Sequence, residues 1–151
     1  MLSQIVPYEV AISKLSRNIG IQRPTTLKYL RNLEEASLNR QIFTDIDSVG
    51  DLQKPDKMLF DNSNPLDSSP DIGTVRETFF CNQLLSDSQK VEYGGWKSGD
   101  FRIDNDIIVE MGGRDKDCRQ VKKEENAYVA ADDIDNATLR KIPPLGLWFL
   151  Y

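Results

Sequence analysis

The chain has 151 residues, enough for one ordinary domain or two small ones, and this length excludes a large multidomain enzyme. Hydrophobic residues make up 39%, charged residues make up 28%, and the mean hydropathy of −0.48 is typical of a globular chain without a membrane span. Histidine is absent, which excludes Ser-His and Cys-His nucleophile pairs, imidazole bases and His-ligated zinc. The N-terminus lacks the residue order of a secretory signal, so we expect a cytoplasmic protein.

The net charge of −5 is distributed unevenly. Residues 1–45 contain six Lys or Arg and four Asp or Glu, a net charge of +2, whereas residues 46–151 contain thirteen and twenty, a net charge of −7. Only the N-terminal part therefore has the sign of charge that favours contact with nucleic acid. Cys81 has apolar neighbours in the sequence, and we expect it to be a buried, inert thiol.

Apolar residues recur at helical spacing over residues 12–42 and predict two amphipathic helices. Ser13 is the expected N-cap of the first helix, and Gly20 is placed to end that helix in the left-handed conformation. Pro24 lies near the first turn of the second helix. The pair indicates a helix-turn-helix, and the alternation of polar and apolar residues over 39–45 predicts the strand of a wing.

Residues 47–71 are rich in Asp, Ser, Asn and Pro and predict a connector with one embedded strand at 57–60. An apolar stripe over residues 75–85 then predicts another helix. The remainder indicates an α/β unit with a surface helix at 118–126. Its expected strands cover residues 90–93, 100–103, 107–111, 127–131 and 145–151.

The expected architecture is therefore of the α+β or α/β class. A winged helix-turn-helix over residues 1–46 is followed by a connector over 47–71 and a mixed-sheet α/β domain over 72–151. No phosphate-binding glycine loop is found, so this chain is not expected to bind ATP.

Glu77, Asp100 and Glu110 are the acidic residues that the predicted elements direct toward one edge of the sheet. Without histidine, a metal would be a hard cation such as Mg²⁺ held by carboxylates, and nucleases that activate water in this way usually add a lysine. Asp100 and Glu110 suit adjacent strands and are the candidate metal ligands. The alternative is a chance grouping, because the chain has 24 acidic residues.

The second predicted helix carries the candidates for DNA contact. Arg23, Lys28 and Arg31 could bind phosphates, and Thr25 and Thr26 could reach base edges from the start of the helix. The alternative is an ordinary solvated helix face.

Several stretches of the chain also resemble a known family. They are residues 12–15, 19–21, 26–30, 33–36, 54–57, 62–64, 72–80, 99–101, 109–113 and 142–143. In combination they are similar to the C-terminal portion of bacterial AAA-type ATP-binding proteins. In that family a P-loop ATPase module precedes a winged helix and a domain of unknown function that is similar to the PD-(D/E)XK restriction-endonuclease fold. The resemblance covers essentially the whole chain.

The resemblance implies roles for the three acids. Glu77 corresponds to the acid on the first helix of the nuclease-like fold, Asp100 to the strand aspartate, and Glu110 to the acid of the E-x-K element. Gly112 stands at the position where that element has its lysine. Only Arg114 or Lys116, in the following loop, could replace that lysine.

The missing lysine favours a non-catalytic accessory module that contacts DNA through the winged helix or docks on an ATPase module or another protein. In that interpretation Glu77, Asp100, Glu110 and Lys116 are vestigial. The alternative is an active metal-dependent nuclease that uses the three acids with Mg²⁺.

Overall fold

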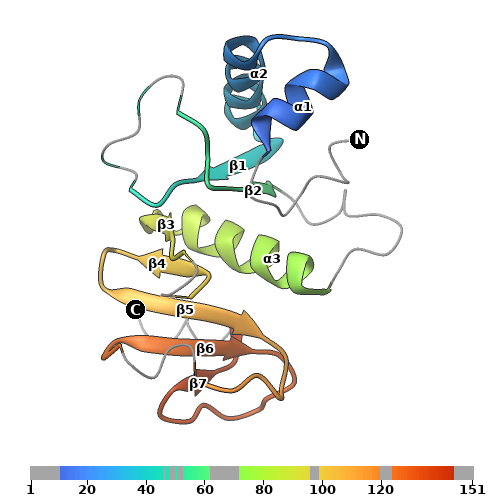
Figure 1. Cartoon of the computed structure of the whole chain (residues 1–151). Coiled ribbons are helices and arrows are strands. Elements are labelled where there is room, and N and C mark those ends of the chain that lie inside the picture. The colour runs from blue at the N-terminus through green and yellow to red at the C-terminus, as the bar shows by residue number, and fades with distance from the viewer. Residues whose placement is uncertain are drawn as a thin grey trace. The chain divides into compact units, whose positions relative to one another are not determined.

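The computed structural model describes residues 11–45, 47, 50, 53–61, 72–95, 99–119 and 124–144 (Figure 1). It has the mixed α+β composition that the sequence predicts. The chain forms two compact units, Met1–Asn82 and Gln83–Tyr151, and each unit is described by itself below. Among the described residues, no helix is long and apolar enough to cross a membrane.

The first unit begins with two helices, α1 at Ile12–Ile19 and α2 at Arg23–Glu35. Gly20 ends α1 with a φ of 71°, which confirms the predicted left-handed C-cap. The predicted N-cap at Ser13 is wrong, because the N-cap is Ala11, two residues earlier, whose carbonyl oxygen accepts the first hydrogen bonds of the helix. Pro24 lies in the first turn of α2, as expected.

A two-stranded antiparallel sheet follows, formed by β1 at Asn39–Ile42 and β2 at Lys57–Phe60. Both strands were expected, and β2 lies within the segment predicted as a connector. Because β2 pairs with β1, that part of the connector belongs to the sheet of the first unit. One buried apolar cluster of the unit joins both helices to this sheet. It consists of Ile12, Leu15, Leu27, Leu30 and Met58.

Helix α3 covers Ile72–Ser86, close to the predicted bounds, and its residues up to Asn82 belong to the first unit. Within that unit the helix is tied to β2 by polar contacts. The Asn82 side-chain amide donates to the carbonyl oxygen of Phe60 at 2.9 Å, and Lys57 Nζ lies 2.8 Å from Glu77 Oε2. The β1–β2 sheet and the first part of α3 are therefore joined by these two polar contacts.

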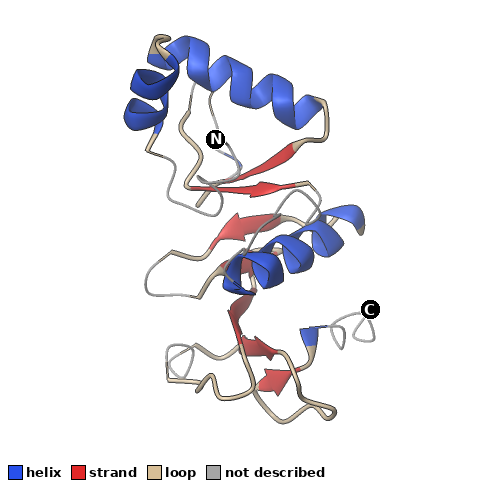
Figure 2. Ribbon diagram, turned by 90° about the vertical axis from the view of Figure 1, so that its right-hand side faces the viewer, coloured by secondary structure: helices blue, strands red, loops and turns tan. Residues whose placement is uncertain are grey.

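The second unit contains a mixed five-stranded sheet in the order β3-β4-β5-β6-β7, labelled in Figure 1 and drawn with red strands in Figure 2. The three strands β3 to β5 are antiparallel, whereas β6 runs parallel to β5 and β7 parallel to β6. The strands are β3 at Val91–Tyr93, β4 at Phe101–Ile103, β5 at Ile107–Gly112, β6 at Ala127–Ala131 and β7 at Lys141–Ile142.

The first four of these strands confirm the prediction to within one residue at each end, and β7 was not predicted. The expected strand over 145–151 lies outside the described residues. For the expected surface helix at 118–126, the described residues at both ends form turns and bends, and the middle lies outside the described part.

Candidate functional site

Asp100 directly precedes β4 and lies against β5. Phe101 pairs with Val109, and the backbone N–H of Asp100 donates to the carbonyl oxygen of Val109 at 2.9 Å. Gly99 makes this approach possible, since its φ is 86° and a Cβ there would lie only 2.9 Å from that same carbonyl oxygen. The sequence thus brings the Asp100 backbone onto the strand that carries Glu110.

The Asp100 carboxylate is fixed by the backbone of β5. Its Oδ2 atom accepts a hydrogen bond from the N–H of Met111 at 2.7 Å. Met111 follows Glu110 in the same strand, so the side chains of the two predicted metal ligands start from adjacent points of the sheet. A charge-assisted hydrogen bond from a backbone donor orients the carboxylate.

Glu110 is 6% exposed, although it is acidic. Its partner is Lys116, whose Nζ atom lies 2.5 Å from Glu110 Oε1. A buried carboxylate requires a partner of opposite charge, because the desolvation of an isolated ion costs several kcal/mol. The side chain of Lys116 remains about one-third exposed and can therefore reach both the carboxylate and solvent.

Gly112 provides the space for Lys116. Residues alternate between the faces of a strand, so position 112 shares the face of Glu110. A Cβ atom at Gly112 would lie 2.5 Å from both Cβ and Cγ of Lys116. The aliphatic stem of Lys116 therefore occupies the place where a side chain at position 112 would begin, and its ammonium group reaches Glu110 from there.

The turn that follows β5 positions this lysine. The Lys116 N–H donates to the carbonyl oxygen of Gly113 at 2.9 Å, which closes a four-residue turn back over the strand. Arg114, the other predicted substitute, is exposed, and its carbonyl oxygen accepts a hydrogen bond from Lys141 Nζ at 2.5 Å. Of the two candidates, Lys116 is the one that contacts Glu110.

Glu77, the third predicted acid, belongs to the first unit and forms a largely buried ion pair with Lys57. Cys81, one turn further along α3, is fully buried, as expected. Burial raises the pKa of the Cys81 thiol to about 12, and the nearby charges of Lys57 and Arg40 only partly offset this effect. The thiol is therefore protonated and unreactive at neutral pH.

Among the predicted DNA-contacting residues on α2, Arg23 and Lys28 are exposed. Thr25 is half-buried. Arg31 is also half-buried, and its guanidinium group donates to the carbonyl oxygen of Gly50 at 2.5 Å. The two exposed cations at the start and in the middle of α2 are thus the best placed to meet a phosphate backbone.

Thr26 is buried where α2 contacts α1. It is 1% exposed, its hydroxyl lies 2.8 Å from that of Ser16, and the same hydroxyl donates to the carbonyl oxygen of Gln22. This contact joins α1 to α2. A DNA base cannot contact the buried Thr26 side chain in this conformation.

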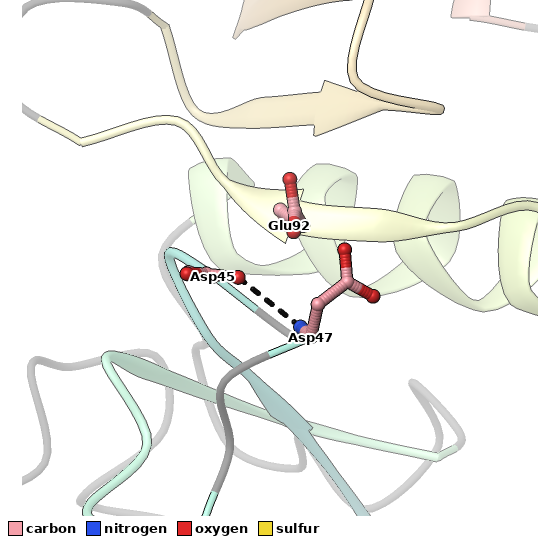
Figure 3. A group of neighbouring side chains, drawn as sticks. All are labelled: Asp45, Asp47 and Glu92. Carbon is pink, nitrogen blue, oxygen red and sulfur yellow. Dashed lines mark hydrogen bonds between the residues drawn. The ribbon is translucent and has the colours of Figure 1, made fainter.

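Asp45 and Asp47 follow β1 and form a local turn in which the Asp47 N–H donates to Asp45 Oδ1 at 3.1 Å (Figure 3). Both side chains are exposed. Glu92, which is drawn with them, belongs to the second unit and pairs there with Lys90 at 3.4 Å. In this contact the Asp45 side chain accepts from the backbone N–H two residues further on, which is an ordinary Asx-turn.

Comparisons of the chain with protein-family models, with curated proteins and with solved structures found no match. The site is therefore interpreted from its own geometry. The family resemblance described from the sequence stays a prediction.

Proposed function

We propose that the second unit is a metal-dependent, nuclease-like domain in which Asp100 and Glu110 hold a hard divalent cation and Lys116 supplies the lysine of the E-x-K element. The observation that carries the proposal is the contact between Lys116 Nζ and Glu110 Oε1 at 2.5 Å. The absence of this lysine from position 112 favours a non-catalytic module in the sequence, and the contact supports Lys116 as a substitute for it.

The donor set fits a hard cation. Two carboxylates start from adjacent points of the sheet, and oxygen ligands of this kind suit Mg²⁺ or Mn²⁺. When bound, such a cation supplies an activated water and neutralises charge on a phosphodiester. The N–H of Met111 keeps the Asp100 carboxylate in place. The ammonium group of Lys116 can stabilise the negative charge that develops on the phosphate.

Metal binding tests this proposal without requiring turnover. A titration with Mn²⁺, followed by the loss of the free-ion signal in electron paramagnetic resonance, is expected to reveal one site in the unmodified protein. Asp100→Asn and Glu110→Gln are each expected to weaken binding at least about tenfold, because each removes a charged ligand. Asp133→Asn, which changes an exposed acid of the same unit, is the matched control. Equal binding by all four proteins would contradict the proposed site.

We propose in addition that the first unit is a winged helix that contacts DNA. The order of α1, α2, β1 and β2, with a hairpin after the second helix, supports this proposal. Arg23 and Lys28 are exposed on α2, and the net charge of residues 1–45 is positive. Assembly with an AAA-type ATPase module would add affinity by bringing several copies together.

With two exposed cations on α2, the DNA affinity of this unit should be weak and only moderately sensitive to salt. The slope of log affinity against log salt is expected to be about −2, since each neutralised phosphate contributes about −0.9. Fluorescence anisotropy with a short duplex measures it. Arg23→Ala and Lys28→Ala should each flatten the slope by about one, whereas Lys14→Ala, on the exposed face of α1, should not. A slope unchanged by both α2 variants would instead indicate a protein-docking element.

A further inference from the structure

The turn that carries Lys116 is attached to the sheet by a second lysine. Lys141, the first residue of β7, donates from Nζ to the carbonyl oxygen of Arg114 at 2.5 Å. Arg114 lies inside the turn that closes at Lys116. The contact therefore links the end of β7 to the segment that presents Lys116.

The register of the sheet explains why Lys141 reaches this turn. Glu110 on β5 is opposite Val129 on β6, and Val129 is opposite Lys141 on β7. Residues that are opposite one another in paired strands share a face of the sheet. Lys141 therefore extends over the same face as Glu110, two strands away, at about 10 Å between the backbones. The turn that contains Arg114 bridges this interval.

Lys141 is itself fixed in place. Its backbone N–H donates to the hydroxyl of Thr138 at 3.2 Å, and its carbonyl oxygen accepts from the N–H of Thr138 at 2.7 Å. A side chain that starts from an anchored strand end can hold a loop carbonyl in a defined position.

We propose that Lys141 is a positioning residue that keeps Lys116 at the candidate site by holding the Arg114 carbonyl, while Gly112 supplies the space for the Lys116 stem. This inference rests on the proposed function and deepens it. Once Glu110 shares its charge with a cation, its attraction for Lys116 weakens, and the turn alone has to keep the ammonium group near the phosphate.

The inference leads to a specific kinetic pattern. In Lys141→Met the candidate ligands Asp100 and Glu110 are untouched, so the Mg²⁺ concentration that gives half-maximal DNA cleavage should stay the same. The rate at saturating Mg²⁺ should fall about tenfold, because misplacement of a group by about 1 Å costs one to two orders of magnitude. Lys141→Arg, which can still donate to the carbonyl, should restore most of the rate. The matched control is Arg140→Met, which removes a contact directed at the carbonyl of Glu124 instead.

A second measurement does not depend on catalysis. The Lys116 amide is hydrogen-bonded to Gly113 inside the turn, so its hydrogen exchange reports whether the turn is closed. Exchange at Lys116 should be at least about fivefold faster in Lys141→Met than in the unmodified protein, and close to the unmodified rate in both Lys141→Arg and Arg140→Met.

The cleavage rate and the hydrogen exchange at Lys116 distinguish a failure of the positioning role from a failure of the proposed function. If the unmodified protein does not cleave DNA, the proposed function fails, and exchange at Lys116 still decides whether Lys141 holds the turn. Exchange that is unchanged in Lys141→Met would overturn the positioning role. So would a rate loss that Lys141→Arg does not restore, or one that Arg140→Met reproduces.

Discussion

Replacing Lys57 with methionine is expected to lower the free energy of unfolding by about 3 kcal/mol, because it removes the Lys57 ammonium group from the largely buried Glu77 carboxylate. Lys57 is 8% exposed, and its Nζ lies 2.8 Å from Glu77 Oε2 at the contact between β2 and α3. Breaking a buried ion pair from one side costs far more than removing the pair as a whole. Urea unfolding at neutral pH measures the effect.

Two further variants test whether the lost ion pair causes this effect. The double variant Lys57→Met/Glu77→Leu should recover stability to within about 1 kcal/mol of the unmodified protein, since it leaves no uncompensated charge. Arg40→Met should cost less than about 1 kcal/mol, because the Arg40–Asp61 pair is more exposed, at 32% and 22%. If Lys57→Met destabilises no more than Arg40→Met, the pair does not hold α3 on the sheet.

Gly112→Ala is the second change with a large expected effect. The new Cβ would lie 2.5 Å from Cβ and Cγ of Lys116, so the turn after β5 has to move. Glu110, which is 6% exposed, then loses the cation that compensates its charge. We expect a loss of about 2–3 kcal/mol in stability, from strain and from the loss of the Lys116–Glu110 ion pair together.

The double variant Gly112→Ala/Lys116→Gly separates these two causes. It relieves the overlap but still lacks the Lys116–Glu110 ion pair, so its stability should lie between those of Gly112→Ala and the unmodified protein. Gly95→Ala is a useful control, because a Cβ there meets nothing within 4 Å, although its φ of 77° is strained. A Gly112→Ala protein as stable as the unmodified one would show that Lys116 does not need this space.

Much of the fold follows from local sequence signals. The left-handed end of α1 follows from Gly20, and strand β6 follows from its apolar run over Ala127–Ala131. Strand β7 has only two residues, Lys141 and Ile142, which is too short for any alternation to stand out. Its existence depends on pairing with β6, which is a tertiary interaction.

The candidate site was only partly predictable for the same reason. Asp100 and Glu110 could be predicted because they flank a short hairpin, and hairpin partners are close in the sequence. The role of Lys116 depends on a turn that folds back over Gly112, and the glycine by itself looks like a missing lysine. The sequence signal was Gly112, because the lack of a side chain there leaves room for the stem of a lysine from the following turn.

Residue pairs that are distant in the sequence were missed altogether. Glu77 was predicted as a catalytic acid, but its ion pair with Lys57, twenty positions away, follows only from the packing of α3 on β2. Thr26 looked like an exposed residue at the start of a helix. The structure buries it against Ser16, because the two helices meet at this point.

The most direct test of the account is DNA cleavage with Mg²⁺ or Mn²⁺ by the purified chain and by Glu110→Gln, Lys116→Met and Arg119→Met. We expect the unmodified protein to nick or linearise plasmid DNA, Glu110→Gln to be inactive, and Lys116→Met to lose about 100-fold in rate, as expected for the loss of a group that stabilises developing charge. Arg119→Met, which removes an exposed cation three residues further along, should cleave normally. Absence of cleavage by the unmodified protein, or full activity of Lys116→Met, would contradict the account and favour the non-catalytic accessory module.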